Sequence, residues 1–363
     1  MALLAQMRRA LSSARVVYLF EFFKLMIFLC PGARHNYHAM TVESESKRQK
    51  TDSEWFPPSV THMESPFSYS TSTFHSEIPK TVLTNRNEPV YLGVDEAGRG
   101  PVMGPMVYGI SYCLESYSKE LKKFGFADSK TLKEDKRQQL FEIIEEHDHE
   151  LNDNVGWATC TMTAKDISSG MLQSSHGKGA YNLNEQAHDT TIQLIKQVLA
   201  KGVNLKYIYV DTVGPPASYQ VKLQKEFPNC SITVAKKADS IYPIVSTASV
   251  VAKVTRDFNL KYYLQNLEYL QGQSIGSGYP SDPNTSRWLN GNVDKAFGWN
   301  FGLIRFSWQT AKDSLVKHGA HEVIYEEDCI KQDSGYVEID SFFCENPQTD
   351  KLKNDFYGKA VSL

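Results

Sequence analysis

Hydrophobic and polar positions between residues 90 and 320 alternate between strand-like and helix-like segments. Short runs rich in β-branched and aromatic residues, typical of buried strands, occur at 90–94, 103–110, 157–163, 207–211 and 231–239. Apolar residues at helical spacing occupy three further segments, at 182–201, at 218–227 and for several turns after Pro243. The order is a β-hairpin, a strand, a helix, a strand, a helix, a strand and a long helix. It predicts a mixed α/β sheet flanked by helices.

Three of the predicted strands end in acidic residues. Asp95 and Glu96 follow the first strand, Asp211 ends the strand at 207–211, and Asp239 ends the strand at 231–239. If these strands run parallel, their carboxyl ends meet at one edge of the sheet, where sites form. Four carboxylates gathered there would repel one another unless cations lay between them. The alternative is three unrelated acids that face solvent.

Such an oxygen-rich cluster suits the hard ions Mg²⁺ or Mn²⁺. Two ions about 4 Å apart can activate a water and stabilise the leaving oxygen in phosphodiester cleavage. Because neighbouring strand residues point to opposite faces, Asp95 and Glu96 share one site only if the strand ends or bulges there. Gly98-Arg99-Gly100-Pro101 breaks the chain just beyond. Its glycines let backbone N–H groups approach a ligand closely.

The charge of the chain is unevenly distributed. The net charge of the 363 residues is −3, whereas residues 321–350 hold nine acids and one base, which leaves a mildly basic remainder. This distribution is compatible with a polyanionic partner without requiring one. The six cysteines include no CxxC pair, so we expect a reduced intracellular protein without disulfides.

The ends of the chain differ in composition from the middle. Residues 1–40 are Arg-rich and acid-poor, which fits a mitochondrial presequence, a signal anchor or a translated upstream segment. The apolar run in this segment is short for a membrane span, so we expect no stable membrane association. We predict a targeting or upstream segment at 1–40, a disordered Ser/Thr/Pro-rich linker at 41–88, a catalytic domain at 89–272, a helical part at 273–320 and an acidic tail at 321–363.

Several motifs resemble the type 2 ribonuclease H family (ribonuclease HII). The resemblance covers about residues 90–320, and its spacing and C-terminal extension are similar to the eukaryotic form, the catalytic subunit of a heterotrimer. The motifs are Asp95-Glu-Ala-Gly-Arg-Gly-Pro, Asp128-Ser-Lys-Thr-Leu, Val210-Asp211, Lys237-Ala-Asp239-Ser, Ser246-Thr-Ala-Ser-Val-Val-Ala-Lys253-Val-Thr-Arg256-Asp257 and Gly276-Ser-Gly-Tyr-Pro-Ser-Asp-Pro.

The resemblance implies a ribonuclease H-like fold with a helical C-terminal extension. The implied activity is endonucleolytic hydrolysis of RNA in RNA–DNA hybrids and 5′ of single ribonucleotides embedded in duplex DNA, leaving 3′-hydroxyl and 5′-phosphate ends. The implied catalytic residues, which would bind two Mg²⁺ or Mn²⁺ ions, are Asp95, Glu96, Asp211 and Asp239. Asp95 would bridge both ions.

The resemblance also implies how the substrate is bound. Gly98, Arg99 and Gly100 would recognise the ribose 2′-OH, mostly through backbone groups. Tyr279 would pack on the sugar of the neighbouring deoxynucleotide, although such a tyrosine is more commonly a packing residue. Phosphates would be contacted by Lys130, Lys253 and Arg256. Surface charge is the alternative for both lysines.

The tail and the expected partners complete the sequence predictions. Residues 336–343 resemble a sliding-clamp-binding box with Tyr336 where Gln is expected. We favour docking to two non-catalytic subunits over clamp binding, and an unstructured acidic tail is the alternative. A nuclear location is expected, with a mitochondrial pool if residues 1–40 direct import. Rival functions are a different nuclease or transposase of this fold and a non-enzymatic nucleic-acid-binding scaffold.

Overall fold

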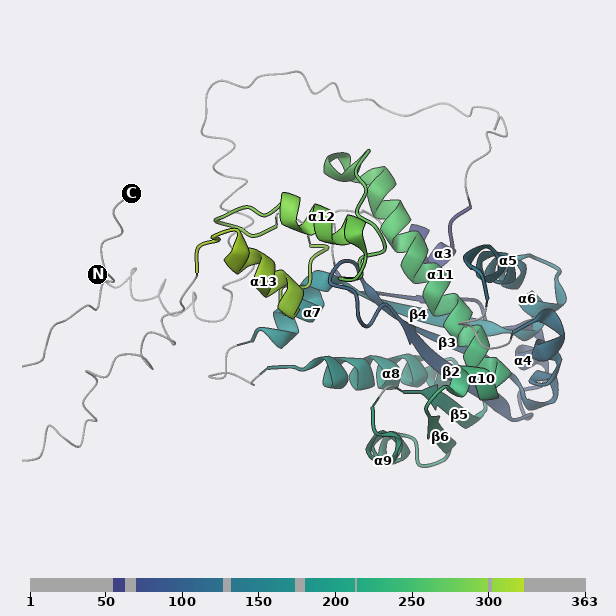
Figure 1. The fold of residues 1–363 in the computed structure, drawn as a ribbon. Helices are drawn as coiled ribbons and strands as arrows, with labels where there is room; N and C mark the ends of the chain where they lie inside the picture. The colour runs from purple at the N-terminus through teal and green to yellow at the C-terminus, as the bar shows by residue number, and fades with distance from the viewer. Residues whose placement is uncertain are drawn as a thin grey trace, which may run out of the picture. The chain divides into compact units, whose positions relative to one another are not determined.

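A six-stranded mixed sheet forms the centre of the fold (Figure 1). The computed structural model describes residues 55–62, 70–126, 132–173, 180–212, 214–299 and 302–322. The strands are β1 (Ser72–His75), β2 (Val90–Ala97), β3 (Met106–Leu114), β4 (Gly156–Met162), β5 (Leu205–Asp211) and β6 (Ser231–Ala235). Their order across the sheet is β1-β4-β3-β2-β5-β6. The mixed α/β sheet expected from the sequence is confirmed.

The central strand β2 has neighbours of opposite direction. It forms an antiparallel hairpin with β3, in which Val90 pairs with Leu114 and Ala97 with Val107. On its other side it runs parallel to β5, and β5 runs parallel to β6. Strand β2, which carries Asp95 and Glu96, is therefore parallel to β5 and β6. This direction is the one that convergence of the predicted acids requires. Their carboxyl ends point to one edge of the sheet.

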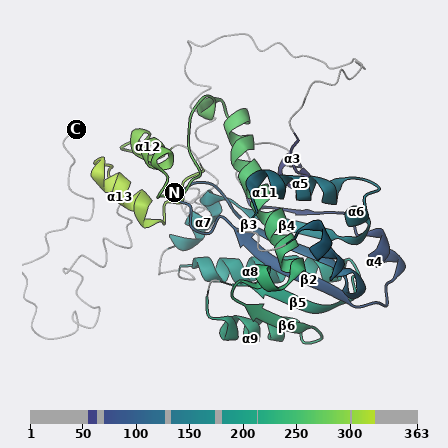
Figure 2. The same cartoon turned by 45° about the vertical axis from the view of Figure 1, so that its right-hand side comes forward.

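Helices cover both faces of the sheet (Figures 1 and 2). The long α11 packs on β2 and β3 with α5 beside it, and α8 covers the opposite face of β3 and β4. Within the described ranges the α-helices are α3 (Pro58–Thr61), α4 (Lys80–Thr84), α5 (Glu134–Glu145), α6 (Glu150–Asn154), α7 (Ala164–Met171), α8 (Leu183–Ala200), α9 (Pro216–Glu226), α10 (Ala238–Ile241), α11 (Pro243–Asn266), α12 (Pro283–Gly291) and α13 (Gln309–Lys317).

Alternation along β2 explains why this strand separates two cores. Val90, Leu92 and Val94 are buried in the cluster that includes α8. On the other face, a Cβ at Gly93 would lie 2.4 Å from the carbonyl oxygen of Ile244 in α11. Only glycine allows the helix backbone to approach so closely. This contact places α11 directly over the strand that carries the first two acids.

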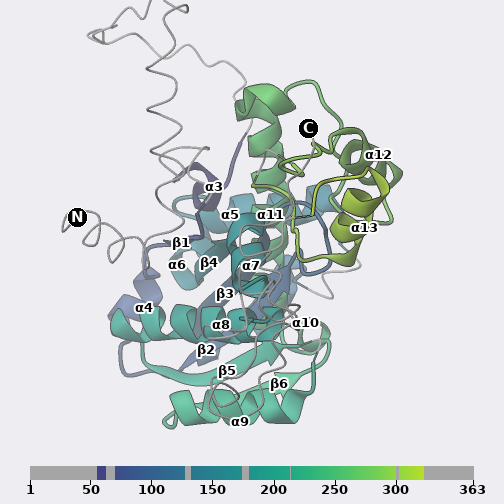
Figure 3. The ribbon, with the colours of Figure 1, turned by 90° about the vertical axis from the view of Figure 1, so that its left-hand side faces the viewer.

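The segment beyond α11 packs into a third core. Val102 and Met103, from the loop after β2, are buried with Leu260 and Tyr263 of α11 and with apolar residues between 267 and 311. Figures 1 and 3 show α12 and α13 lying side by side near the C-terminal half of α11. The loop after β2 is therefore part of the C-terminal packing unit as well as of the sheet.

The prediction that residues 41–88 are disordered was wrong for the part that the structure describes. That part holds α3, β1 and α4, and β1 pairs with β4 at the sheet edge. Trp55 packs edge-to-face on Phe258, with ring centroids 5.5 Å apart, and Phe74 stacks on Trp157 at 5.1 Å. Isolated aromatic residues fix this segment through tertiary contacts, which leave no periodic pattern in the sequence.

Other predictions concern residues outside the described ranges. They include the targeting segment at 1–40, nearly all of the tail at 321–363, and Lys130. Within the ranges described above, none of the helices combines the length and the apolar character needed to cross a bilayer.

Candidate active site

A groove opens at the sheet edge where β2 extends past β5. Pairing of β2 with β5 ends at Val94 and Val210, whereas pairing of β2 with β3 continues to Ala97. One side of β2 therefore has no strand partner from Asp95 onward. We call this hollow the edge groove. Its lining residues are Asp95, Glu96, Ala97, Gly98, Arg99, Gly100, Arg137, Asp211, Lys253, Arg256, Asp257 and Tyr279.

Asp95 and Glu96 reach the groove from opposite faces of the strand. Asp95 shares its face with Gly93, towards α11, and is only 5% exposed. Glu96 shares its face with Val94, towards α8, and is half-buried. Of the two expected arrangements the strand shows no bulge at these acids: β2 stays paired with β3 through both and ends at Ala97, one residue beyond Glu96. Because pairing with β5 already stops at Val94, both acids reach one opening near the end of the strand.

Burial is the main influence on the ionisation of these two acids. It raises the pKa of Asp95 to about 7 and that of Glu96 to about 8, and repulsion from Asp211 and within the pair adds to the effect. A hydrogen bond with Ser249 and the charge of Lys253 oppose the shift at Asp95. Arg99 and Lys253 oppose it at Glu96. Without a cation, this pair favours retention of protons near neutral pH.

The remaining two predicted acids are placed differently from each other. Asp211 is the last residue of β5, and its Oδ1 accepts a 2.8 Å hydrogen bond from the Ala238 N–H of α10. Asp239 does not end a strand: β6 ends at Ala235, Lys237 adopts φ 58°, and Asp239 lies in α10. It is 3% exposed and is absent from the groove lining. The strand predicted to reach Asp239 was thus too long, because the chain reverses at Lys237.

The donor set of the groove fits hard divalent cations. Asp95, Glu96 and Asp211 all offer carboxylate oxygens, the ligand type that Mg²⁺ and Mn²⁺ prefer. The buried, mutually repelling pair Asp95 and Glu96 would be stabilised in its charged form by a cation. In the described part of the chain, however, no group of three or more Asp, Glu, His or Cys side chains is arranged so that it could coordinate a metal ion. The acids share a groove without forming a closed ligand cage.

The loop after β2 lines the groove with backbone. Gly98 has φ 76°, and a Cβ there would lie 2.7 Å from the Pro105 carbonyl oxygen. Gly100 is exposed, and a Cβ there would lie 3.4 Å from the ring of Tyr279. The Arg99 side chain donates a hydrogen bond to Asn184 at the start of α8. The three predicted recognition residues and Tyr279 thus meet at one wall of the groove.

Two of the predicted phosphate contacts, Lys253 and Arg256, also line the groove. Lys253 Nζ donates a 2.8 Å hydrogen bond to Ser249 Oγ. Arg256 is 7% exposed, pairs with Asp257 at 2.9 Å, donates to the Ser277 carbonyl and lies 5.6 Å from the ring centroid of Tyr279. It therefore supports the turn that carries Tyr279. Its Nε has no hydrogen-bond partner within the described residues.

Sequence reasoning missed three residues at this site. Arg137 of α5 lines the groove, and its position in a charged helix gave no signal. Arg305 is fully buried and donates to backbone carbonyls of the loop at residues 98–104. Trp308 donates to the Gly100 carbonyl at 3.1 Å. Only a signal linking residues about 200 positions apart in sequence could have found the last two.

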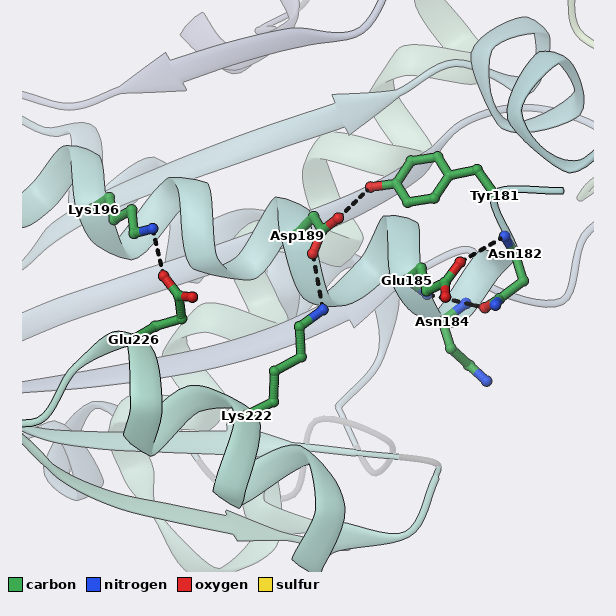
Figure 4. A network of polar contacts seen from close by, with 8 residues as sticks. All are labelled: Tyr181, Asn182, Asn184, Glu185, Asp189, Lys196, Lys222 and Glu226. Carbon is green, nitrogen blue, oxygen red and sulfur yellow. Dashed lines mark hydrogen bonds and ion pairs between the residues drawn. The ribbon is translucent and has the colours of Figure 1, made fainter. Parts of the chain in front are cut away.

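A second hollow adjoins the edge groove on the α8 side. Glu96, Arg99 and Asp211 line both, and α8 and α9 form the outer wall of the second. Figure 4 shows how the two helices are joined: Lys222 lies 2.9 Å from Asp189, and Lys196 lies 2.5 Å from Glu226. Asn182 caps α8 through a capping box with Glu185. These contacts fix the N-terminus of α8 where Asn184 meets Arg99.

Comparison with known proteins agrees with this architecture. The family model of ribonuclease HII matches residues 92–311. A ribonuclease H2 subunit from Schizosaccharomyces pombe is 47% identical over 273 residues, covering 75% of this chain and 80% of the relative. The corresponding ribonuclease H2 subunit from Homo sapiens is 46% identical over 260 residues, covering 71% and 83%.

A solved structure provides a further match. The crystal structure of ribonuclease H2 from Pyrococcus horikoshii OT3 aligns with a TM-score of 0.50 and 30% identity, covering 63% of this chain and 98% of that chain. The segment matched by the family model contains all but the first two residues of β2, the whole of β5 and the edge groove. We conclude that the chain belongs to the ribonuclease HII family and is a ribonuclease H hydrolase.

Proposed function

We propose that the chain is an endonuclease that hydrolyses RNA in RNA–DNA hybrids and cuts 5′ of single ribonucleotides embedded in duplex DNA. The observation that carries the proposal is the composition of the edge groove. Asp95, Glu96 and Asp211 lie in the same hollow as the loop at residues 98–100 and Tyr279. Carboxylates suited to phosphodiester hydrolysis thus adjoin backbone groups suited to contact a 2′-OH.

The acids supply the hydrolytic part of the proposal. Asp95, Glu96, Asp211 and Asp239 would hold two Mg²⁺ or Mn²⁺ ions, which supply water activation and charge stabilisation at the leaving oxygen. Asp95 and Glu96 would release their protons as cations bind, because metal ligands must be deprotonated. Cleavage of the bond on the 3′ oxygen side of the phosphate leaves 3′-hydroxyl and 5′-phosphate ends.

The loop and Tyr279 supply selectivity. A 2′-OH both donates and accepts hydrogen bonds, and it is the group that distinguishes RNA from DNA at a site. Gly98 and Gly100 lack side chains that would hold a sugar away from the backbone. The ring of Tyr279, 41% exposed beside Gly100, offers a flat surface to the next sugar. This arrangement would favour an RNA-to-DNA junction.

Basic side chains position the duplex without reading its sequence. Lys253 and Arg256 line the groove, and Arg137 adds a third cation on the α5 side. Contacts to phosphate fix the register of a duplex and carry no sequence information. An enzyme with these contacts would cut wherever a ribonucleotide occurs.

The test is cleavage of three matched duplexes with Mg²⁺: all-DNA, DNA with one ribonucleotide, and an RNA–DNA hybrid. We expect a cut 5′ of the single ribonucleotide, cuts within the hybrid, and none in all-DNA. Asp211→Asn should abolish cleavage and retain duplex binding. Equal cutting of all-DNA would instead support a different nuclease of this fold.

Assembly and location form part of the same proposal. The relatives are named as subunits of ribonuclease H2, and we propose that this chain is likewise the catalytic member of a complex with two non-catalytic subunits. Residues 321–363 would supply a docking segment for those subunits or for a sliding clamp. The test is co-purification with candidate subunits, done with the full chain and with a chain ending at residue 322. Loss of co-purification in the shorter chain would indicate that assembly depends on the tail. A nuclear site of action fits this substrate.

A further inference from the structure

Arg305 contacts three backbone carbonyls of the loop at residues 98–104, which we call the recognition loop. Its Nη2 donates to the Gly98 carbonyl at 2.6 Å, its Nη1 to the Arg99 carbonyl at 3.0 Å, and its Nε to the Gly104 carbonyl at 3.1 Å. The side chain is 0% exposed. A buried guanidinium satisfied by neutral carbonyls holds those carbonyls firmly, because breaking any bond leaves a buried charge with fewer partners.

Trp308 extends the same contact to the end of the loop. Its Nε1–H donates to the Gly100 carbonyl at 3.1 Å, and its ring lies 4.8 Å from the Arg305 guanidinium carbon. Each of the three successive carbonyls of residues 98–100 thus accepts a hydrogen bond from a side chain of the segment before α13. Arg305 donates to the first two and Trp308 to the third. We call Arg305 and Trp308 the carbonyl clamp.

Fixing these carbonyls also fixes the amides that follow them. In a trans peptide the C=O and the next N–H point in opposite directions. With the Gly98 and Arg99 carbonyls turned to buried Arg305, the Arg99 and Gly100 N–H groups are turned away from it. Within the described residues neither amide donates to a protein acceptor. Both belong to residues that line the edge groove.

The backbone of Arg305 is also linked to the turn that carries Tyr279. The Gly278 carbonyl accepts from the Val102 N–H at 2.9 Å and the Met103 N–H at 3.2 Å. The Val102 carbonyl in turn accepts from the Arg305 N–H at 2.9 Å. The loop that carries Gly100 and the turn that carries Tyr279 therefore share one hydrogen-bonded support. Their spacing across the groove depends on the segment around residue 305.

We infer that Arg305 and Trp308 are positioning residues that aim the Arg99 and Gly100 amides at the ribose and so set the preference for a ribonucleotide. This inference rests on the proposed function, because it concerns how that function distinguishes ribose from deoxyribose. Neither side chain contacts the substrate in this role. They act through the backbone of the loop, which places a determinant of selectivity in the C-terminal part of the chain.

The experiment measures a discrimination ratio, the Kd for all-DNA duplex divided by the Kd for the same duplex with one ribonucleotide. It uses the full chain in EDTA, together with kcat and KM for cleavage in Mg²⁺. Trp308→Phe keeps an aromatic ring and removes one donor, so we expect the ratio to fall about threefold to fivefold. Arg305→Lys keeps the charge but cannot satisfy three carbonyls, so we expect a fall of about tenfold or more.

The matched control is Arg287→Gln, which removes an exposed arginine of α12 whose side chain donates to Asn284; its ratio should equal that of the parent. Thermal unfolding of each variant shows whether a change in the discrimination ratio accompanies a loss of stability. If Arg305→Lys folds poorly, the discrimination ratio of Trp308→Phe tests the inference by itself. In the clamp variants, affinity for all-DNA should stay within about twofold of the parent, since phosphate contacts are untouched.

Two results would overturn the inference. One is an unchanged ratio in Trp308→Phe and Arg305→Lys while the parent discriminates. The other is an equal loss of affinity for both duplexes, which would indicate a merely structural role. If the unmodified chain itself shows no preference for the ribonucleotide, the proposed function fails first.

Discussion

At the scale of single residues, the groove combines groups that are costly to place together. Asp95 is buried and Glu96 is half-buried, and the raised pKa values of both have desolvation as the first cause. Gly98 is held at a positive φ, with the Pro105 carbonyl in the space that a Cβ would fill. Burial of the two carboxyls lowers stability unless a ligand compensates for it, and the backbone at residue 98 accepts only glycine. Each gives a direct prediction.

The contribution of Asp95 and Glu96 to the stability of the metal-free chain should fall as the pH rises from about 4 to about 8. The folded pKa values of these two carboxyls, about 7 and about 8, lie above those of unfolded carboxyls. Through these two groups the folded state binds more protons in this window, so raising the pH weakens their contribution to folding. Asp95→Asn should remove part of this cost and stabilise the protein by roughly 1–3 kcal/mol at pH 8.5, with little effect near pH 4.

Urea unfolding in EDTA at several pH values measures this effect. Asp313→Asn, at an exposed position of α13, is the control and should follow the parent at every pH. A stability difference between Asp95→Asn and the parent that does not change with pH would contradict the assignment. In the parent, added Mg²⁺ should raise the midpoint more at pH 8.5 than at pH 5, because ligands must be deprotonated.

Gly98→Ala should abolish cleavage, because the new Cβ would meet the Pro105 carbonyl oxygen at 2.7 Å and displace the loop. Gly125 offers a matched control with φ 90° and no atom within 4 Å of a built Cβ. Gly125→Ala should cost about 1 kcal/mol of stability through backbone strain alone and leave activity intact. Steady-state cleavage of a one-ribonucleotide duplex and thermal unfolding measure both effects. Equal activity in the two variants would argue against a demanding role for the loop backbone.

At the scale of elements, the site depends on supports that lie behind it. α11 presents Lys253 and Arg256 to the groove on one side, and aromatic residues of the N-terminal segment pack on it from another. Ser59 of α3 shares a buried 2.8 Å hydrogen bond with Thr255, the neighbour of Arg256. Residues 55–62 and 70–84, outside the family match at 92–311, therefore form part of the folded unit.

Phe74→Ala should destabilise the protein by about 2–3 kcal/mol, because β1 loses the ring that stacks on Trp157. Phe297→Ala is the matched control: that ring is 70% exposed, and its loss should change stability by less than about 0.5 kcal/mol. Denaturant unfolding compares the two. A chain that starts at residue 85 should be less stable than Phe74→Ala, since it lacks β1 and α3 entirely. Unchanged stability on that truncation would show that the N-terminal segment is dispensable.

At the scale of the whole molecule, basic side chains lie at the edge groove of a chain whose net charge is slightly negative. The net charge is −3 overall, yet the edge groove carries Arg99, Arg137, Lys253 and Arg256 beside its acids. Phosphate contacts contribute affinity that depends on salt and not on sugar type. The basic residues and the carbonyl clamp should therefore have separable effects on binding.

Lys253→Gln should weaken binding of all-DNA and ribonucleotide-containing duplexes by the same factor. It should also reduce the slope of log K against log salt by about 1, as expected for the loss of one phosphate contact. Lys261→Gln on the same helix is the control, because Lys261 lies over the Phe258 ring at 5.2 Å and does not line the groove. Fluorescence anisotropy over a salt series in EDTA provides the slopes. A change in the ratio between the two duplexes would place Lys253 at the sugar and not at the phosphate.

The sequence alone determined the features that local pattern encodes. The alternation of residues 90–94 and 207–211 specified strands, helical spacing specified α8 and α11, and the motif at residues 95–101 placed Asp95 and Glu96 before a glycine-rich loop. These features follow from side-chain period and turn chemistry within short segments. They were sufficient to predict a mixed sheet and the acids that gather at one edge of it if the strands run parallel; the parallel pairing itself came from the structure.

Only the tertiary structure decided which distant groups meet. Asp95 and Glu96 share a groove because pairing with β5 ends one residue before them, and the length of a neighbouring strand is absent from the local sequence. Asp239 lies in α10 and not at a strand end because the chain turns at Lys237. Phe74, Arg305 and Trp308 act across gaps of about 80–200 residues. Such contacts have no period along the chain, since packing alone brings the partners together.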